Sequence, residues 1–336
     1  KKADNVIALN QEGSLVINTE IPAKGNASYL YIFAVLPPLF WAGNFLLARM
    51  FRDAIPPFQM SFWRWVLAFL ILLALALPHL RSQASQIRKE LPFLAFLGAV
   101  GITAFNCLVY KALHHTTVIN AALINSLMPV ITFLLALIII GDRLNLRQIA
   151  GVIVSVAGAL AIIARGNLSQ LGTFSVDAGD LLVLAGVSFW ALYTVLIKWR
   201  PTKLPPMVFL SITVGFGTLF HLPLVFWELA QVGSFTPDVP NIAVLVYFAA
   251  FPSVLAYIFW GRAVAALGPG KTGIFMHLMP VFSTILAVAF LNEALHAYHF
   301  FGMALIVSGI FLVTGAPRSS PVAGRNDTPA VQKNTG

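Results

Sequence analysis

The most constraining feature of the sequence is an internal duplication of apolar segments. The stretch from Tyr110 to Ile163 recurs about 150 residues later, from Gly261 to Thr314. Within it, Met128-Pro129-Val130 aligns with Met279-Pro280-Val281. The same spacing pairs further residues: Ala136 with Ala287, Gly141-Asp142 with Asn292-Glu293, Gly151 with Gly302, and Gly158 with Gly309. A chain of this kind is expected to fold as two similar units.

The duplication extends to the earlier part of each half. Phe40-Trp41-Ala42 matches Phe189-Trp190-Ala191, and Pro56-Pro57 matches Pro205-Pro206. This earlier offset is two residues shorter than the later one, which indicates a small loop insertion. The sequence therefore predicts a first repeat over residues 29–165 and a second over 178–315. Tails of residues 1–28, without strong structural signals, and 316–336 flank the repeats.

The composition places these repeats in a membrane. Of the 336 residues, 59% are hydrophobic and 10% are charged, whereas soluble domains carry roughly 25% charged residues. Apolar runs of about 20 residues indicate membrane-spanning helices, because a helix satisfies its own backbone hydrogen bonds in lipid. Ten such runs occur, at residues 30–50, 57–79, 90–111, 117–140, 146–165, 179–198, 206–229, 241–263, 271–291 and 297–315.

The basic residues predict how the chain is oriented. Sixteen Lys and Arg residues fall in the two tails and in the connections that follow spans 2, 4, 6 and 8, all on one side of the membrane. Four lie on the opposite side. This asymmetry predicts that both termini are cytoplasmic. The net charge of +9 is explained by this asymmetry, so we expect the lipid bilayer as partner and no nucleic acid. Each repeat has five spans, an odd number, so the second repeat enters the membrane inverted.

Inverted repeats are a recurring transporter architecture, with a substrate site between the halves at mid-membrane. The predicted fold is therefore an all-α membrane protein, with ten transmembrane helices in two inverted five-helix repeats around a central cavity. No P-loop, zinc-protease, nucleophile-elbow or EF-hand pattern occurs, so we predict no enzyme activity, no cofactor and no metal site.

The repeated motifs resemble a known family. The pattern Y-x-A-L, N-A-A-L-I-N-S-L-M-P-V, G-D-R-L and G-V-I-V-S-V-A-G, and its copy H-L-M-P-V, N-E-A-L and G-M-A-L-I-V-S-G, is similar to the drug/metabolite transporter superfamily. Within it, the chain resembles ten-helix proteins with two EamA domains over about residues 30–315. The aromatic residues are most similar to those of bacterial aromatic amino acid exporters. This resemblance implies a multi-pass protein of the bacterial inner membrane that exports amino acids or related metabolites.

Polar and aromatic residues recur at matching depths in six predicted spans. Trp41 and Asn44 are three residues apart and share a helical face, as do Trp190 and Tyr193. Such groups either satisfy each other by helix packing or line a cavity that holds water and solute. The predicted substrate-binding set comprises Trp41, Asn44, Asn106, Tyr110, Asn125, Met128, Trp190, Tyr193, Ser253, Tyr257, Trp260 and His277.

Four residues are predicted to weaken helices near the membrane centre. Pro129 and Pro280 lie near the middle of spans 4 and 9, and a proline removes a backbone hydrogen bond. Pro252 in span 8 aligns with Gly101 in span 3. These positions are either hinges of a gate or static kinks.

Charged residues are rare inside the predicted spans. Arg64 lies about 10 Å into span 2, where it would either bind a substrate carboxylate or extend to the lipid headgroups, or serve a purely structural role. Carboxylates occur near span ends, which leaves His277 as the proton-carrier candidate, with a neutral, hydrogen-bonded histidine as the alternative. Glycines seven residues apart in spans 5 and 10 indicate close helix packing, either internally or in a dimer.

The predicted function is export of aromatic or large neutral amino acids, or related small metabolites, by alternating access. A carrier for phosphorylated or nucleotide-linked solutes is the second hypothesis, although such polyanions need several cavity cations. A membrane enzyme acting on lipid-linked substrates is the third.

Overall fold

The computed structural model describes residues 7–9, 15–17, 28–112, 124–164, 178–291 and 294–315. The first half contains α1 (Ser28–Met50), α2 (Pro57–Gly98), the π-helix η1 (Ala99–Ala104), α3 (Phe105–Ala112), α5 (Met128–Ile140) and α6 (Leu146–Ile163). The second half contains α8 (Ala178–Trp199), α9 (Pro206–Val232), α10 (Val239–Phe248), the π-helix η2 (Ala249–Leu255), α11 (Ala256–Leu267), α12 (Pro269–Gly273), the 3₁₀ helix η3 (Ile274–His277), α13 (Leu278–Leu291) and α14 (Ala297–Thr314).

The described helices account for ten membrane passes. Eight apolar helical stretches are long enough to cross a membrane, and Met128–Ile140 is a shorter apolar helix. One of the eight, Pro57–Val109, has 53 residues, so it measures about 80 Å at 1.5 Å per residue. A bilayer core is only about 30 Å thick. This stretch therefore crosses twice, and the predicted all-α, ten-helix membrane fold is confirmed.

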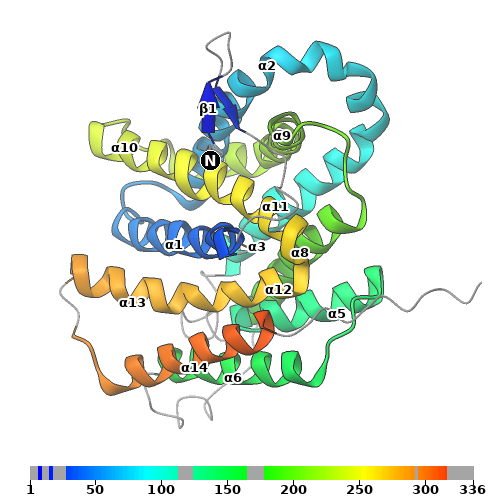
Figure 1. Ribbon diagram of the computed structural model, residues 1–336. Coiled ribbons are helices and arrows are strands. Elements are labelled where there is room, and N and C mark those ends of the chain that lie inside the picture. The colour runs from blue at the N-terminus through cyan, green and yellow to red at the C-terminus, as the bar shows by residue number, and fades with distance from the viewer. Residues whose placement is uncertain are drawn as a thin grey trace, which may run out of the picture.

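The connection between spans 2 and 3 corrects one expectation. The runs 57–79 and 90–111 were expected to be separate helices with a loop between them, whereas α2 continues through this segment. Residues 79–90 contain neither glycine nor proline, and Gln86 donates a hydrogen bond to Glu90 one turn later. Pro78 and Pro92 flank the segment, and prolines bend helices without always ending them. Figure 1 shows the resulting arch of α2.

The repeated sequence motifs set the helix ends. Pro57 and Pro206, from the two Pro-Pro pairs, are the first residues of α2 and α9, where the missing N–H has no intrahelical partner to lose. Gly141 ends α5 in the left-handed conformation, with φ of 69°. Asn145 then begins α6 with a capping box, in which its side chain and that of Gln148 bond each other's backbone N–H.

Close helix pairs lie at the two ends of the molecule (Figure 1). At one end, α6 packs against α14, and a Cβ at Gly158 would meet the Gly302 carbonyl oxygen at 2.6 Å. Likewise, a Cβ at Gly309 would meet the Gly151 oxygen at 2.5 Å. The glycine stripes thus serve internal packing. At the other end, α2 packs along α9, where a Cβ at Gly98 would approach the Thr213 oxygen to 2.5 Å.

Between these pairs, the helices of the two halves interleave. α1 packs on α13 and α11, and the equivalent α8 packs on α5 and α3. Exchanging the halves therefore reproduces the same set of neighbours, as expected for an inverted duplication. α2, α8 and α11 contribute most of the largest group of buried apolar side chains, and α1 adds Trp41 to it.

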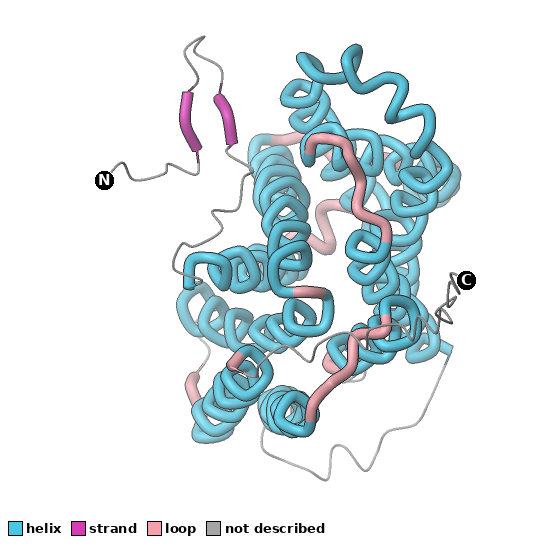
Figure 2. The backbone as a smooth tube through the Cα atoms, turned by 45° about the vertical axis from the view of Figure 1, so that its right-hand side comes forward, coloured by secondary structure: helices cyan, strands magenta, loops and turns pink. Residues whose placement is uncertain are grey.

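The N-terminal tail contains one structural element that the sequence analysis did not anticipate. Ile7–Leu9 (β1) and Leu15–Ile17 (β2) pair antiparallel, with Ala8 opposite Val16. Both segments are apolar and partly β-branched, and the sequence between them contains Gly13, so hairpin formation is physically reasonable. The two strands are drawn in magenta in Figure 2.

Candidate functional site

A cluster of aromatic side chains occupies the centre of the molecule. The closest ring pairs in it are Trp41 with Trp190, at a centroid distance of 5.1 Å, and Trp65 with Tyr257, at 5.2 Å, followed by Tyr257 with Trp190, at 5.3 Å. Most pairs meet edge to face or tilted, the favourable geometry for aromatic rings. The aromatic cluster consists of Trp41, Trp65, Trp190, Tyr193, Tyr257 and Trp260, all buried. It draws on α1, α2, α8 and α11, so both halves contribute to it.

The two π-helices lie beside the aromatic cluster at pseudo-equivalent positions. In η1, the Phe105 N–H bonds the Val100 oxygen, which releases the Gly101 carbonyl from the helical hydrogen-bond ladder. In η2, the Ala256 N–H bonds the Phe251 oxygen and releases the Pro252 carbonyl in the same way. π-Helical turns are rare and are frequent at functional sites. The two residues predicted to weaken the ladder, Gly101 and Pro252, are therefore the ones with released carbonyls.

Side chains of the opposite half bind these released carbonyls. The Trp41 Nε1–H donates to the Pro252 oxygen at 2.9 Å. The Tyr257 hydroxyl donates to the Gly101 oxygen at 3.0 Å. Each half thus supplies an aromatic donor to the π-helix of the other, and both bonds would break if the halves separated at this point.

Arg64 lies next to the aromatic cluster and is only 4% exposed. Its two terminal nitrogens donate to Asn44 Oδ1 and Asn106 Oδ1, each at 3.2 Å. Its guanidinium carbon lies 4.8 Å from the centre of the Trp65 ring, a cation–π contact. The expectation that Arg64 extends to the headgroups is thus not met: its charge lies within the protein, where it joins α1, α2 and α3.

His277 lies away from the aromatic rings. Its Nε2 contacts the Ser126 carbonyl at 2.9 Å and its Nδ1 contacts the Ser155 hydroxyl at 2.6 Å. A carbonyl can only accept, so Nε2 donates to Ser126, whereas the Ser155 hydroxyl can either donate to Nδ1 or accept from it. These contacts join η3 to α6 and to the turn before α5.

The remaining predicted residues are distributed around the centre. Met128 is buried within the same core as the aromatic cluster, and Ser253 is buried in η2 one turn before Tyr257. Asn125 is half-buried in the turn that precedes α5. The side chain of Tyr110 lies outside the described residues.

One of the two prolines of spans 4 and 9 differs from its predicted position. Pro129 lies in the first turn of α5 rather than in the middle of a helix. In span 9, α12, η3 and α13 follow one another directly, so Pro280 lies near the middle of one helical stretch, Pro269–Phe290, just after its 3₁₀ segment. Proline is tolerated in a first turn because the N–H it lacks would have no intrahelical partner there.

The sequence analysis missed several buried polar contacts. Trp260 donates to Thr194 at 3.0 Å, and His221 lies between Ser61 and the Gly217 carbonyl. Glu228, at the end of α9, accepts from the first backbone N–H groups of α2, those of Phe58 and Gln59. A carboxylate at a helix N-terminus also meets a favourable dipole. Except for the contact between His221 and Gly217, which are one turn apart, each contact joins residues far apart in sequence, so no local pattern indicated it.

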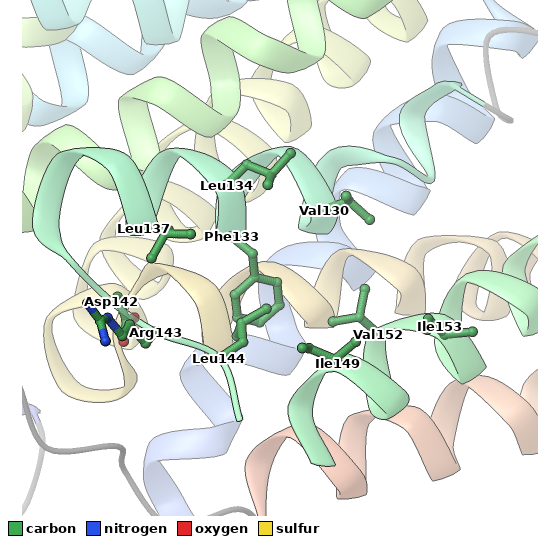
Figure 3. Close-up of a pocket in the computed structure, with 10 residues that line it drawn as sticks. All are labelled: Val130, Phe133, Leu134, Leu137, Asp142, Arg143, Leu144, Ile149, Val152 and Ile153. Carbon is green, nitrogen blue, oxygen red and sulfur yellow. The ribbon is translucent and has the colours of Figure 1, made fainter. Parts of the chain in front are cut away.

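A separate groove of about 550 Å³ lies between α5 and α6 (Figure 3). Apart from Asp142 and Arg143 at one end, its lining is aliphatic or aromatic, including Phe133 and Ile153. Ile153 is 64% exposed, so the groove opens on the outer surface. None of the predicted substrate-binding residues lines it.

The fold and this centre define a class of protein. Two inverted five-helix units, ten membrane passes and a shared buried centre form the architecture of a membrane transporter. The sequence profile of the EamA-like transporter family matches residues 28–164 and 177–315. The chain therefore belongs to the EamA-like transporter family, which lies within the drug/metabolite transporter superfamily.

Similar proteins extend over most of the chain. It is 28% identical to the uncharacterized transporter YyaM of Bacillus subtilis, over 86% of this chain and 94% of that protein. It is also 28% identical to a probable terminal-alkyne amino-acid exporter of Streptantibioticus cattleyicolor, over 87% of this chain and 96% of that protein. A solved crystal structure, 21% identical, shares the fold with a TM-score of 0.69 and covers 85% of this chain and 96% of that one.

Proposed function

We propose that this transporter exports amino acids, aromatic or large neutral ones first, or related small metabolites. The observation that carries the proposal is the aromatic cluster, formed by both halves and closed by the reciprocal bonds from Trp41 and Tyr257. The similarity to a protein named as a probable amino-acid exporter supports this substrate class. The solute would pass through a central aromatic-lined cavity by alternating access.

The chemistry of the centre fits an amphipathic solute. Trp190, Tyr193 and Tyr257 offer ring surfaces on which an apolar side chain packs. Asn44, Asn106 and Arg64 offer polar groups on the adjacent side. A phosphorylated or nucleotide-linked solute would need several cations, whereas Arg64 is the one Lys or Arg among the buried residues of the described chain.

Alternating access requires the packed cluster to open. The released carbonyls of Gly101 and Pro252 lose no helical hydrogen bond when their aromatic donors leave, because the π-turns have already freed them. Water or solute would replace the aromatic donors, as is usual where irregular backbone lines a membrane cavity. We propose these π-helices, together with Pro129 and Pro280, as the hinges.

We also propose a membrane and an orientation for the transporter. The distribution of Lys and Arg supports a bacterial inner-membrane protein with both termini in the cytoplasm. Export then means movement from the side of the termini to the other side. Cysteine labelling of added terminal cysteines with a membrane-impermeant reagent in intact cells tests this orientation, and labelling of either terminus would contradict it.

The transport proposal is tested by flux of labelled phenylalanine into proteoliposomes. We expect saturable flux by the native protein, without chemical change of the solute. Trp41→Ala and Tyr257→Ala should lower this flux by at least about tenfold, since each removes a ring and a bond between the halves. Trp227→Ala is the matched control, because Trp227 is 58% exposed on the outer surface. Normal flux in both cluster variants would refute the assignment of the cavity.

A further inference from the structure

The charge of Arg64 is buried without an opposite charge. Its hydrogen-bond partners, Asn44 and Asn106, offer neutral amide oxygens. Among the described residues, no carboxylate lies within ion-pair distance of Arg64. Burying a cation is costly unless an anion compensates it, and an ionisable residue inside a membrane span is usually functional. The site therefore lacks one negative charge.

The atoms around Arg64 also lack hydrogen-bond acceptors. Arg64 Nε, Trp65 Nε1 and Trp190 Nε1 are buried and have no hydrogen-bond partner among the residues that the structure describes. Guanidinium and indole nitrogens are donors only, so none of the three can satisfy another. Donors gathered without acceptors are complementary to an acceptor-rich, negatively charged group.

Arg64 and Trp65 are connected to the aromatic cluster by a series of ring contacts. Arg64 contacts the face of the Trp65 ring, and the Trp65 ring lies 5.2 Å from that of Tyr257. The Tyr257 ring in turn lies 5.3 Å from that of Trp190. Arg64 and Trp65 thus adjoin the aromatic cluster, and Arg64 links it to Asn44 and Asn106.

We propose that Arg64, with the Trp65 indole N–H, binds the carboxylate of the transported solute. A carboxylate supplies two oxygens, which match Arg64 Nε and one terminal nitrogen in the bidentate geometry that arginine favours. The amide oxygens of Asn44 and Asn106 hold the guanidinium plane in place while the carboxylate is absent. This assignment rests on the proposed transport of amphipathic solutes. It narrows the substrate class to solutes that have a free carboxylate.

The experiment compares acids with their neutral amides. Purified native protein in detergent is titrated with phenylalanine and phenylalaninamide, and separately with 3-phenylpropanoate and its amide, while the thermal unfolding midpoint is followed. A bound ligand raises this midpoint by mass action. We expect each acid to bind about 10- to 100-fold more tightly than its amide, the range for hydrogen bonds to a charged group.

Two variants test whether Arg64 carries this preference. Arg64→Gln removes the charge, so the preference for the acids should disappear. Asn44→Asp places a carboxylate beside Arg64 as an internal competitor, so the preference should also disappear, in a protein whose buried charge is now paired. This second variant keeps the test decisive if Arg64→Gln fails to fold. A purely structural Arg64 would leave the acid-to-amide ratio unchanged in folded Asn44→Asp.

Arg262→Gln is the matched control. Arg262 is half-buried on α11 and contacts the face of the Phe33 ring, at 5.3 Å from the ring centre. The same loss of charge there should leave the acid-to-amide ratio as in the native protein. An equal loss of the ratio in Arg262→Gln would overturn the assignment of the site to Arg64.

The remaining outcomes separate this inference from the transport proposal. Arg64-dependent binding of 3-phenylpropanoate without binding or flux of phenylalanine would confirm the carboxylate site and refute amino-acid export. Flux of phenylalanine and its amide at equal rates would support export and overturn the carboxylate site. Chloride that stabilises the protein as well as the acids do, through Arg64, would identify a halide site and overturn it too.

Discussion

The two halves of the molecule share a backbone plan but carry different side chains at the centre. Both have a π-helix next to the aromatic cluster, a proline pair that begins the second helix and glycines that allow the last helices to touch. At three central positions the side chains differ between the halves: Asn44 and Tyr193, Arg64 and Thr213, and Asn106 and Tyr257. The first half supplies polar groups where the second supplies two rings and a hydroxyl.

This difference shows how a symmetric scaffold can hold an asymmetric solute. Helix packing depends on the small residues at the contacts, which the duplication preserved. A site for an amphipathic molecule needs a polar side and an apolar side, which identical halves could not provide. The pseudo-equivalent residues Asn106 and Tyr257 therefore differ, although both lie beside the same π-helix carbonyl region.

The equivalent residues Trp41 and Trp190 also depart from two-fold symmetry, in the hydrogen bonds of their indole N–H groups. Trp41 donates to the Pro252 carbonyl, so an exact two-fold axis would let Trp190 donate to the Gly101 carbonyl. Tyr257 occupies that carbonyl instead, and Trp190 Nε1 is left without a partner. The second half thus lacks one symmetric bond, and its tryptophan is an unpartnered donor within the aromatic cluster.

The largest effect is expected where the halves are most alike. Gly158→Leu should destabilise the protein by at least about 3 kcal/mol, because overpacking cannot be relieved when the obstacle is backbone. The new Cβ would meet the Gly302 oxygen at 2.6 Å and the Ile306 nitrogen at 2.8 Å. Thermal unfolding in detergent measures the effect. Gly261→Ala is the control, because its Cβ would meet nothing within 4 Å, and equal stability of the two variants would contradict close packing of α6 on α14.

A smaller effect is expected from the bonds that cross between halves. Tyr257→Phe should cost about 1 to 3 kcal/mol of stability, because it leaves the Gly101 carbonyl both released from its helix and unpaired. Tyr298→Phe, on α14 outside the aromatic cluster, serves as the control. Unfolding midpoints equal to that of the native protein in both variants would show that this bond does not hold the closed state.

The smallest effect is expected from Trp190→Phe, which tests the broken symmetry directly. Trp41→Phe and Trp190→Phe remove similar volume, but Trp41 loses a hydrogen bond whereas Trp190 loses a buried N–H without a partner. Trp41→Phe should therefore be less stable than Trp190→Phe by about 1 to 3 kcal/mol. Equal unfolding free energies would mean that both indoles are satisfied alike, and would remove Trp190 from the set of unpartnered donors.

Much of the candidate site followed from helical spacing. The three-residue spacing within Trp41 and Asn44, and within Trp190 and Tyr193, placed each pair on one face, and all four side chains are buried at the centre. The same reasoning did not select Trp65, which follows Arg64 in span 2 and has no polar residue three or four positions after it. It also grouped His277 with the aromatic residues, although its partners are Ser126 and Ser155.

The helix boundaries show where local patterns are insufficient. The polar segment around Arg88 reads as a loop by hydropathy, yet it is helical, because its residues favour helix and the chain can bend at the flanking prolines. Pro129 was expected to kink a helix, whereas it starts one. Proline fixes its own backbone and removes one donor, but the surrounding helices decide whether the chain bends or restarts there.

The sequence by itself determined the membrane class, the duplication and the inverted pairing of the halves, because hydrophobicity, periodicity and an odd number of spans per repeat are properties of the chain. Only the tertiary structure decided which buried groups meet: Tyr257 with Gly101, Arg64 with two asparagines, and Trp190 with no partner. The physical reason is that hydrogen bonds depend on distance and direction between helices, and those are fixed by packing across the two halves rather than by spacing within either one.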